Sequence, residues 1–395
     1  MGRKTTKAFL ETEKRQEERA FCFAVGLQRE QSDEDVERSL AELVELARSC
    51  DAVVVGTMSQ RRPKFDPATY MGQGKLEELK LAAEAAGANI LICDDELSPA
   101  QLRNIEDYCH MKVVDRSLLI LDIFARRATS SEGKLQVELA QQAYLLPRLQ
   151  AQVGFHSRTG GGIGTRGPGE TIMDRDRRHI RKRMDHLKDE LKKLEQRRQR
   201  DREQRARQGK VINVAVVGYT NAGKSTLVNA LCKSDLYTED KVFATLDPSS
   251  RKLYLPEIKK DVILTDTVGF VRKLPHHLVE AFKSTLEEAV HADVILHVVD
   301  ASDSTALECM QVCQDLLRQL GAASVPTIDV LNKVDQVGDE GINPELLVHL
   351  RSDREHGPCC ISALKKEGLD ELKARLVAVI LDQRPDAAWP TSQGE

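Results

Sequence analysis

The sequence lacks the features that would place it in a membrane or outside the cell. None of its apolar runs approaches the roughly 18 residues that a membrane helix needs, so we expect no stable membrane insertion. The start of the chain mixes both charge signs without an apolar core, and we therefore expect no secretory leader. Nine cysteines are scattered through apolar stretches with no Cys-x-x-Cys pair. This pattern favours reduced, buried thiols and a cytoplasmic protein.

An excess of one charge is also missing. The formal net charge of the 395 residues is -4, so no global field marks nucleic acid as the partner, and any basic surface must be local. One local excess occurs at 174–210, which holds 16 Lys or Arg against 8 Asp or Glu. This stretch is a candidate contact to phosphates. From charge alone, a solvated helix with mixed ion pairs is an equally good interpretation.

Length and pattern predict an α/β protein of several domains. We expect a polar tail over 1–19, a small α/β domain over 20–127, a helical hairpin over 128–210, a second α/β domain over 211–365, and a helix with a polar tail over 366–395. In the first domain, short β-rich runs alternate with runs of helical spacing, which is typical of a parallel sheet. Ser32 and Ser98 stand at expected helix N-caps. The run Gly72 to Lys75 has the wrong spacing for a phosphate loop; we interpret it as a turn before a helix and leave a second nucleotide site there open.

Two heptad stripes predict the hairpin. Mostly apolar residues recur at alternating steps of four and three from Leu135 to Val153, and again from Ile180 to Leu194 beyond a glycine-rich stretch. Two such helices joined by a loop should fold back as an antiparallel pair. The first arm would be about 30 Å long. Pro147 inside it predicts either a kink or two separate helices.

A phosphate-binding loop opens the second α/β domain. The β-branched run 211–217 leads into Gly218-Tyr219-Thr220-Asn221-Ala222-Gly223-Lys224-Ser225, and a helical pattern follows. Strand, glycine loop and helix in this order are the context that the motif requires. We predict that the loop amides hold phosphates, that Lys224 reaches the β and γ phosphates, and that Ser225 ligates Mg²⁺. Alone, the motif indicates only a nucleotide phosphate.

Three further motifs at strand ends identify the nucleotide. After one strand comes Asp266-Thr267-Val268-Gly269, where the carboxylate can hold the metal through water and Gly269 can offer its N–H to the γ-phosphate. Another strand ends in Asn332-Lys333-Val334-Asp335, and Asp335 can accept from the N1–H and 2-amino group of guanine, whereas adenine has an unprotonated N1 there. Charge-assisted bonds predict a preference for guanine over adenine of order a hundredfold or more. Ser362-Ala363-Leu364 should complete the base pocket through backbone contacts. The four motifs in this order predict a P-loop, Ras-like G domain and a GTPase.

Two positions bear on the switch and on the rate of hydrolysis. Thr245, in Phe243-Ala244-Thr245-Leu246-Asp247, is the candidate threonine that closes over Mg²⁺ and the γ-phosphate, an ordinary loop threonine being the alternative. We therefore assign catalytic roles to Lys224, Thr245, Asp266 and Gly269, with Ser225 and Thr245 as metal ligands. Ras-like enzymes commonly carry a glutamine after the glycine that orients the attacking water, but this chain has Phe270, and we expect slow basal turnover.

These motifs, together with the string Gly160-Gly161-Gly162-Ile163-Gly164-Thr165-Arg166-Gly167-Pro168-Gly169-Glu170 between the two helical stripes, resemble HflX, a translation-factor-related GTPase family. The resemblance runs from about residue 20 to 365, and the glycine-arginine string is its most specific part. It implies binding to the large ribosomal subunit and its rRNA, splitting or rescue of stalled ribosomes under stress, and activation of hydrolysis by the ribosome. Arg158 and Arg166 would supply phosphate or base contacts, a disordered hairpin tip being the alternative.

Other functions remain open from the sequence. We expect a cytoplasmic protein that is a monomer when free and associates with ribosomes. A second hypothesis is a module for structured RNA or ribosome assembly, in which GTP is a structural ligand and hydrolysis is incidental. Only the first hypothesis predicts a large rate increase on adding large subunits. Asp335 disfavours a third interpretation, an ATP-driven RNA remodeller.

Overall fold

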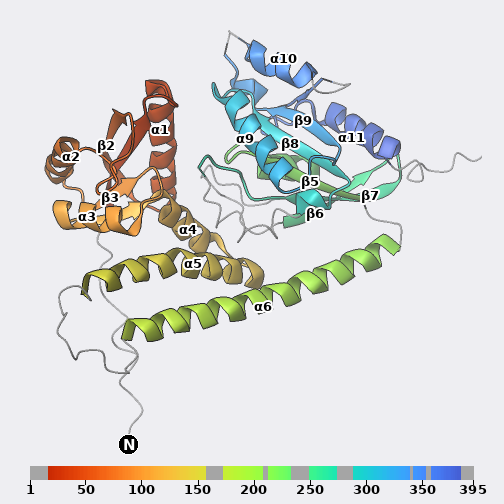
Figure 1. Cartoon of the computed structure of the whole chain (residues 1–395). Helices are drawn as coiled ribbons and strands as arrows, with labels where there is room; N and C mark the ends of the chain where they lie inside the picture. Colours follow the sequence, from red (N-terminus) through yellow and green to blue (C-terminus); the bar gives the residue numbers. More distant parts are fainter. Residues whose placement is uncertain are drawn as a thin grey trace, which may run out of the picture. The chain divides into compact units, whose positions relative to one another are not determined.

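A computed structural model describes residues 17–156, 172–207, 212–232, 249–273, 288–338, 341–352 and 357–383. The chain divides into two compact units, Met1–Ile120 and Leu121–Glu395 (Figure 1). Within the described ranges, every helix is too short or too polar to span a bilayer. The finer division into five parts stays a prediction.

The first unit contains a four-stranded parallel sheet in the order β2-β1-β3-β4, which confirms the predicted small α/β fold. Its strands are β1 (Arg19–Leu27), β2 (Val53–Arg62), β3 (Ile90–Cys93) and β4 (Lys112–Asp115). Between them lie α1 (Asp33–Ser49), α2 (Gln73–Ala85) and α3 (Pro99–Cys109), and α4 (Arg116–Arg127) follows β4. Each parallel pair of strands needs such a crossover helix.

Local side-chain chemistry sets the helix starts in this sheet domain. Ser32 and Ser98 cap α1 and α3, since each side chain accepts from the third helical N–H and the third residue's side chain accepts in return. Both caps are as predicted. Gly72 is the N-cap of α2, and Gln73, Gly74 and Lys75 already belong to the helix, so the run that we interpreted as a turn before a helix is the start of the helix itself.

Strand β2 is longer than the sequence indicated. The apolar, β-branched run of the sequence ends at Val55, whereas the strand pairs with β1 up to Arg62. Gly56 lies inside it, and a Cβ at Gly56 would come 2.4 Å from the ring of Phe21. The aromatic ring of β1 therefore occupies the space where another residue would carry a side chain, which a glycine in a single sequence does not reveal.

Two long helices form the predicted hairpin, α5 (Ser131–His156) and α6 (Ile172–Arg207), which run alongside each other (Figure 1). Arg183 donates two hydrogen bonds to Glu138, at 2.6 and 2.8 Å, and Arg198 lies 2.9 Å from Glu132. Because the earlier residue of α5 faces the later residue of α6, the pair is antiparallel. Helix α5 continues through Pro147 as one helix, which excludes two separate helices.

The buried face of α5 differs from the predicted leucine stripe. Gln136, Val137, Ala140 and Tyr144 are buried, whereas the described side chains of the predicted stripe are half-buried. Helix α5 carries apolar side chains on more than one face, so their spacing alone does not select the packed one. On α6, Leu187 is the one fully buried side chain among those described.

A six-stranded mixed sheet forms the second α/β fold, in the order β10-β9-β8-β5-β7-β6. Its strands are β5 (Ile212–Gly218), β6 (Ser249–Leu255), β7 (Lys260–Asp266), β8 (Val294–Asp300), β9 (Thr327–Asn332) and β10 (Cys359–Cys360). Strand β6 is antiparallel to β7, and the other neighbours are parallel.

Helices cover both faces of this sheet. Val214 and Val216 of β5 share a core with α7 (Lys224–Cys232) and α11 (Leu369–Gln383), while the alternate residues Ala215 and Val217 pack toward α9 (Ala306–Gln319). Helix α10 (Pro344–Ser352) packs beside α9. A strand, loop and helix at the centre of such a sheet is the arrangement that we predicted for a Ras-like G domain.

Candidate nucleotide-binding site

The predicted nucleotide motifs follow the carboxyl ends of neighbouring parallel strands. Strand β5 ends in Gly218, β7 in Asp266 and β9 in Asn332. Since these strands are parallel through β8, their ends meet at one edge of the sheet. Ligands of open α/β sheets bind at such an edge.

Close backbone approach explains the glycines of the phosphate loop. At Gly218 (φ +153°) a Cβ would lie 2.2 Å from the carbonyl oxygen of Val298, so only glycine lets β5 and β8 come together there. At Gly223 (φ +89°) a Cβ would lie 2.3 Å from Nδ2 of Asn332. Asn221 adopts a left-handed φ of 61°, which asparagine tolerates better than most residues. The loop conformation therefore depends on residue types that the motif supplies.

The side chain of Lys224 lies against the backbone of the phosphate loop. It is 7% exposed, and Nζ donates a hydrogen bond to the carbonyl oxygen of Tyr219 at 2.8 Å. Burial lowers the pKa of Lys224, and the nearby Asp266 carboxylate opposes that shift. A buried ammonium is costly without a counter-charge, so an anionic phosphate beside Nζ would be stabilised.

A hydroxyl and a carboxylate provide oxygens for a metal. The Ser225 hydroxyl donates to Oδ2 of Asp266 at 2.6 Å, and Asp266 is fully buried. Oxygen donors suit Mg²⁺, which is usually held by one or two protein groups together with the phosphates of a nucleotide. In the described parts of the chain, no group of three or more His, Cys, Asp or Glu side chains could hold a metal by itself. The residues present therefore fit a Mg²⁺ ion that arrives with a triphosphate.

Backbone hydrogen bonds join the segment after β7 to the phosphate loop. The N–H of Phe270 donates to the Gly218 carbonyl at 3.1 Å, and the N–H of Thr220 donates to the Phe270 carbonyl at 2.8 Å. A Cβ at Gly269 would lie 2.8 Å from Cγ2 of Thr220 and 3.0 Å from Nζ of Lys224. Gly269 therefore lies against the loop, beside the ammonium that we expect to contact the γ-phosphate.

Phe270 points into the protein core. Its side chain is 2% exposed and packs with Ala215, Val217 and Cys313 between the sheet and α9. A buried, apolar ring cannot hydrogen-bond to an attacking water. The expectation of slow basal turnover stays a prediction, with this placement in its favour.

Asn332 connects the two halves of the expected base pocket. Its side chain is 2% exposed; Nδ2 donates to the Ala222 carbonyl at 2.9 Å, and Oδ1 accepts from the Ala363 N–H at 3.0 Å. Ala222 belongs to the phosphate loop and Ala363 to the loop after β10. One amide group therefore fixes both loops to the end of β9.

The expected guanine-binding carboxylate is well placed to stay charged. The Asp335 side chain is 8% exposed, and Nζ of Lys365 lies 3.9 Å from Oδ2. A hydrogen bond from the Ser362 side chain, helped by the charges of Lys365 and Lys333, lowers the pKa of Asp335. Ser362 is buried while Leu364 is 72% exposed, as expected if this loop contributes backbone groups.

The sequence did not indicate two neighbouring contacts. Asp300, at the end of β8, pairs with Nζ of Lys333 at 2.7 Å, and Lys333 has a left-handed φ of 63°. The position of Asp300 at the end of an apolar strand is the feature of the sequence that could have indicated a role at this edge of the sheet. The Tyr219 hydroxyl accepts from the backbone N–H of Arg272 at 2.7 Å, a contact across 53 positions for which the sequence carries no signal.

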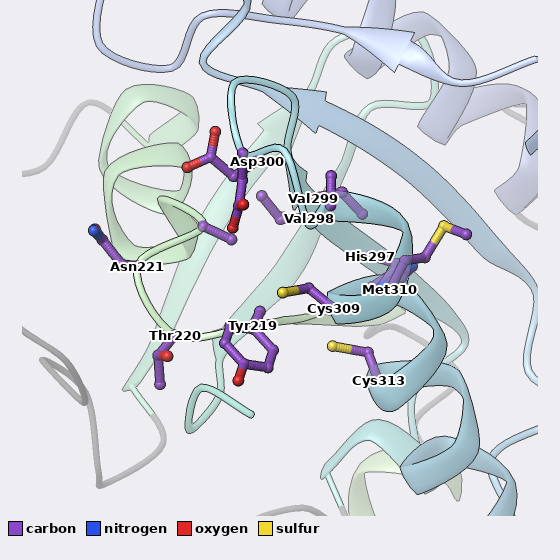
Figure 2. A pocket seen from close by; sticks show the side chains of 13 residues that line it. Tyr219, Thr220, Asn221, His297, Val298, Val299, Asp300, Cys309, Met310 and Cys313 are labelled. Carbon is purple, nitrogen blue, oxygen red and sulfur yellow. The ribbon is translucent and has the colours of Figure 1, made fainter. Parts of the chain in front are cut away.

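A cavity of about 90 Å³ lies between the phosphate loop and α9 (Figure 2). Tyr219 and Thr220 line one side, and Cys309 and Cys313 of α9 line another. His297 also lines it, with Nδ1 3.0 Å from the Asp329 carboxylate. This volume suits a few water molecules. The lining includes none of the described side chains that are predicted to contact phosphate, metal and base, which are those of Lys224, Ser225, Asp266 and Asp335, so the cavity is separate from those predicted contacts.

The structure brings together the predicted residues of the loop at 218–225, of 266–269, of 332–335 and of 362–364. The predicted segment 243–247, with Thr245, lies outside the described residues, as do Arg158 and Arg166. The individual roles assigned to all of these residues stay predictions.

Comparison with known proteins covers nearly the whole chain. Three family models match in succession: a GTP-binding GTPase N-terminal region at 37–125, a GTP-binding GTPase middle region at 127–205, and a 50S ribosome-binding GTPase at 213–333. GTPase HflX of Caldanaerobacter subterraneus subsp. tengcongensis is 50% identical over 360 residues, which cover 91% of this chain and 79% of that protein. GTPase HflX of Escherichia coli K12 is 44% identical over 307 residues, which cover 78% and 71%. A solved structure, a GTP-binding protein of Sulfolobus solfataricus in complex with GDP, is 24% identical with a TM-score of 0.47, covering 92% of this chain and 99% of that one.

Proposed function

Since the chain belongs to the HflX family of GTPases, we propose that it binds the large ribosomal subunit and couples GTP binding and hydrolysis to the splitting or rescue of stalled ribosomes under stress. The chain is a GTPase, and its match to a 50S ribosome-binding family supports the large subunit as its partner. We further propose the domain boundaries predicted above, in which the hairpin follows the N-terminal domain and precedes the G domain along the sequence.

The convergence of the nucleotide motifs at one sheet edge supports this function most directly. Asn332 joins the phosphate loop to the loop after β10 through two buried hydrogen bonds. Asp335 would select guanine, Lys224 and the loop amides would bind the phosphates, and Gly269 would contact the γ-phosphate. Ser225 and Thr245 would ligate Mg²⁺, with Asp266 holding it through water. The ion would neutralise charge that develops on the phosphates during hydrolysis.

The burial of Phe270 supports a dependence on the ribosome. A Ras-like enzyme needs a polar group to orient the attacking water, and the position after Gly269 cannot supply one from the core. Hydrolysis would therefore be slow until the large subunit orders or contributes the missing group. GTP would then be hydrolysed only after the protein has bound the large subunit.

Helix α6 offers a surface for rRNA. Several of its basic side chains are exposed: Arg175, Arg178, Arg181, Lys182, Lys188, Lys192, Lys193, Arg197 and Arg200. Side chains of this kind bind phosphates through charge, with a strength that falls as salt rises. Acidic residues are interspersed among them, so the contact would be spread along the helix. Arg158 and Arg166, in the tip string, would add contacts to RNA at the end of the hairpin.

GTP turnover of the full-length protein, measured with and without purified large subunits, tests the proposal. We expect slow turnover alone and an increase of at least about tenfold with subunits, because the ribosome supplies the missing water-orienting group. Sedimentation of whole ribosomes in the same reactions should show conversion to subunits that depends on GTP. Lys224→Ala, which removes the expected phosphate contact, should abolish both effects.

Two outcomes would count against this function. Turnover that subunits do not change would favour the alternative, a structured-RNA or ribosome-assembly module in which hydrolysis is incidental. Rapid single-turnover hydrolysis by the isolated protein would contradict the role given to Phe270. Arg158→Ala with Arg166→Ala should weaken ribosome binding and spare GTP binding, and unchanged ribosome affinity would exclude the tip as a contact.

A further inference from the structure

The chain directly after Gly269 is tied down by side chains as well as by backbone bonds. The backbone N–H of Arg272 donates to the Tyr219 hydroxyl at 2.7 Å. The guanidinium of Arg272 lies 2.7 Å from Glu308 of α9. Phe270, which lies between Gly269 and Arg272 in the sequence, is 2% exposed. A side chain of the phosphate loop therefore holds a point three residues beyond Gly269.

We propose that Tyr219 is a positioning residue for γ-phosphate recognition, whose hydroxyl fixes Gly269 through Arg272 and so helps the protein to bind GTP in preference to GDP. The inference rests on the proposed function, in which the N–H of Gly269 contacts the γ-phosphate. It gives the side chain of this loop residue a role in discriminating substrate from product, in addition to the phosphate binding predicted for the loop amides.

The ring of Tyr219 is held in place by packing, so its hydroxyl has a defined position. Tyr219 is half-buried and packs against the apolar cluster that includes Cys313 of α9 (Figure 2). A ring fixed in this way offers its hydroxyl oxygen at one point at little cost in entropy. The Arg272 N–H that it accepts is thereby held at a fixed distance from the phosphate loop.

Gly269 packs closely against the phosphate loop, so a small shift would change the distance between its N–H and a bound γ-phosphate. A Cβ at this position would lie 2.8 Å from Cγ2 and 2.9 Å from Cα of Thr220, and 3.0 Å from Nζ of Lys224. The glycine therefore touches the same loop that would hold the β and γ phosphates. A shift of the following residues would move its N–H relative to a phosphate that Lys224 keeps in place, and hydrogen bonds weaken steeply with distance and angle.

The affinity for GDP should not depend on the Tyr219 hydroxyl. GDP has no γ-phosphate, so it makes no contact with Gly269 in the proposed site. The two backbone bonds between Gly218, Thr220 and Phe270 remain when the hydroxyl is removed, so the loop that would bind the shared phosphates is kept. A loss confined to the triphosphate would separate this role from a general role in loop packing.

Tyr219→Phe in the full-length protein, which removes one oxygen and keeps the ring, tests the inference. We expect the dissociation constant of a non-hydrolysable GTP analogue to rise about two- to tenfold, the range for one lost hydrogen bond, with that of GDP unchanged within about twofold. The GDP titration also reports that the variant is folded. Tyr254→Phe is the matched control: this tyrosine is 57% exposed on β6, and neither constant should change.

Arg272→Ala separates the hydroxyl from the ion pair with Glu308, because it keeps the backbone N–H. It should leave the ratio of the two dissociation constants within about twofold of the parent. An equal effect of Tyr219→Phe on both nucleotides, no effect on either, or a change of the ratio by Arg272→Ala as large as that by Tyr219→Phe would each overturn the inference. Failure of the proposed function would instead appear in the parent protein, as no guanine nucleotide binding or no response to large subunits.

Discussion

Replacing Asn332 with alanine should weaken GDP and GTP binding by the same factor. The amide group is almost fully buried, and it bonds the Ala222 carbonyl at 2.9 Å and the Ala363 N–H at 3.0 Å. Alanine removes both bonds. At about 0.5 to 1.5 kcal/mol for each, the loss is roughly 1 to 3 kcal/mol.

That loss acts on the arrangement of the two loops before any nucleotide arrives. If the loops separate in a fraction of the molecules, the apparent dissociation constant rises in inverse proportion to the fraction that is still competent. With 1.4 kcal/mol for each factor of ten, the constant should rise by about five- to 140-fold. Neither bond involves the γ-phosphate contact, so GDP and a non-hydrolysable GTP analogue should be affected alike.

Calorimetric titration of the full-length protein with each nucleotide measures both constants. Asn343→Ala is the control: its Oδ1 accepts from the N–H of Glu345 at the start of α10, and it lies outside the nucleotide motifs, so nucleotide affinity should not change. Two results would refute the reasoning: a folded Asn332→Ala protein whose GDP affinity is within twofold of the parent, or a loss confined to the triphosphate.

Three other perturbations have outcomes set by the structure. Asp335→Asn should lower GDP affinity roughly a hundredfold in titrations. Because the Ser362 side chain lowers the pKa of Asp335, this difference in affinity between parent and variant should stay constant from about pH 8 to 6. Gly218→Ala should lower the melting temperature by about 4 °C or more, since its Cβ would come 2.2 Å from a Val298 backbone oxygen. Glu138→Gln should lower the melting temperature by no more than about 2 °C, with a difference that shrinks in high salt, because the ion pair it breaks is more than one third exposed.

Each of these outcomes has its own check. A carboxylate with a depressed pKa keeps its contribution above the ordinary carboxyl range and loses it as the pH falls through the lowered value, so a smaller difference in GDP affinity between parent and Asp335→Asn at about pH 6 than at pH 7 would contradict the role of Asp335. Gly338→Ala is the control for Gly218→Ala, because a Cβ at Gly338 meets nothing within 4 Å and should leave the melting temperature unchanged. A salt-independent loss for Glu138→Gln would mean that packing, and not charge, holds the hairpin there.

The G-domain fold and the residues of its motifs could be predicted because each motif depends on local chemistry. Glycines at 218 and 223 mark places where the backbone must pass another atom closely, and a carboxylate at a strand end must lie at the edge of the sheet. Ser32 indicated a helix start for the same reason, since its side chain accepts a hydrogen bond from the N–H of Asp35 in the first turn. Such signals act over a few residues and survive in a single sequence.

Features that depend on distant partners could not be predicted. The length of β2 is set by pairing with β1, and the close approach of Phe21 explains the glycine inside it. The packed face of α5 is chosen among several apolar faces by what lies beside it. The motif that contains Asn332 indicated the residue but not that its amide joins two loops from 110 positions before it and 31 positions after it.

Helix α6 has a mechanical consequence that follows from its dimensions. Its 36 residues, at 1.5 Å of rise each, make a rod about 54 Å long. A rotation of only about 5° at one end of such a rod displaces the other end by about 5 Å, close to one helical turn. A small tilt where this helix begins would therefore displace its other end by about one helical turn, and the distances from probes at its two ends to a fixed reference would measure that displacement.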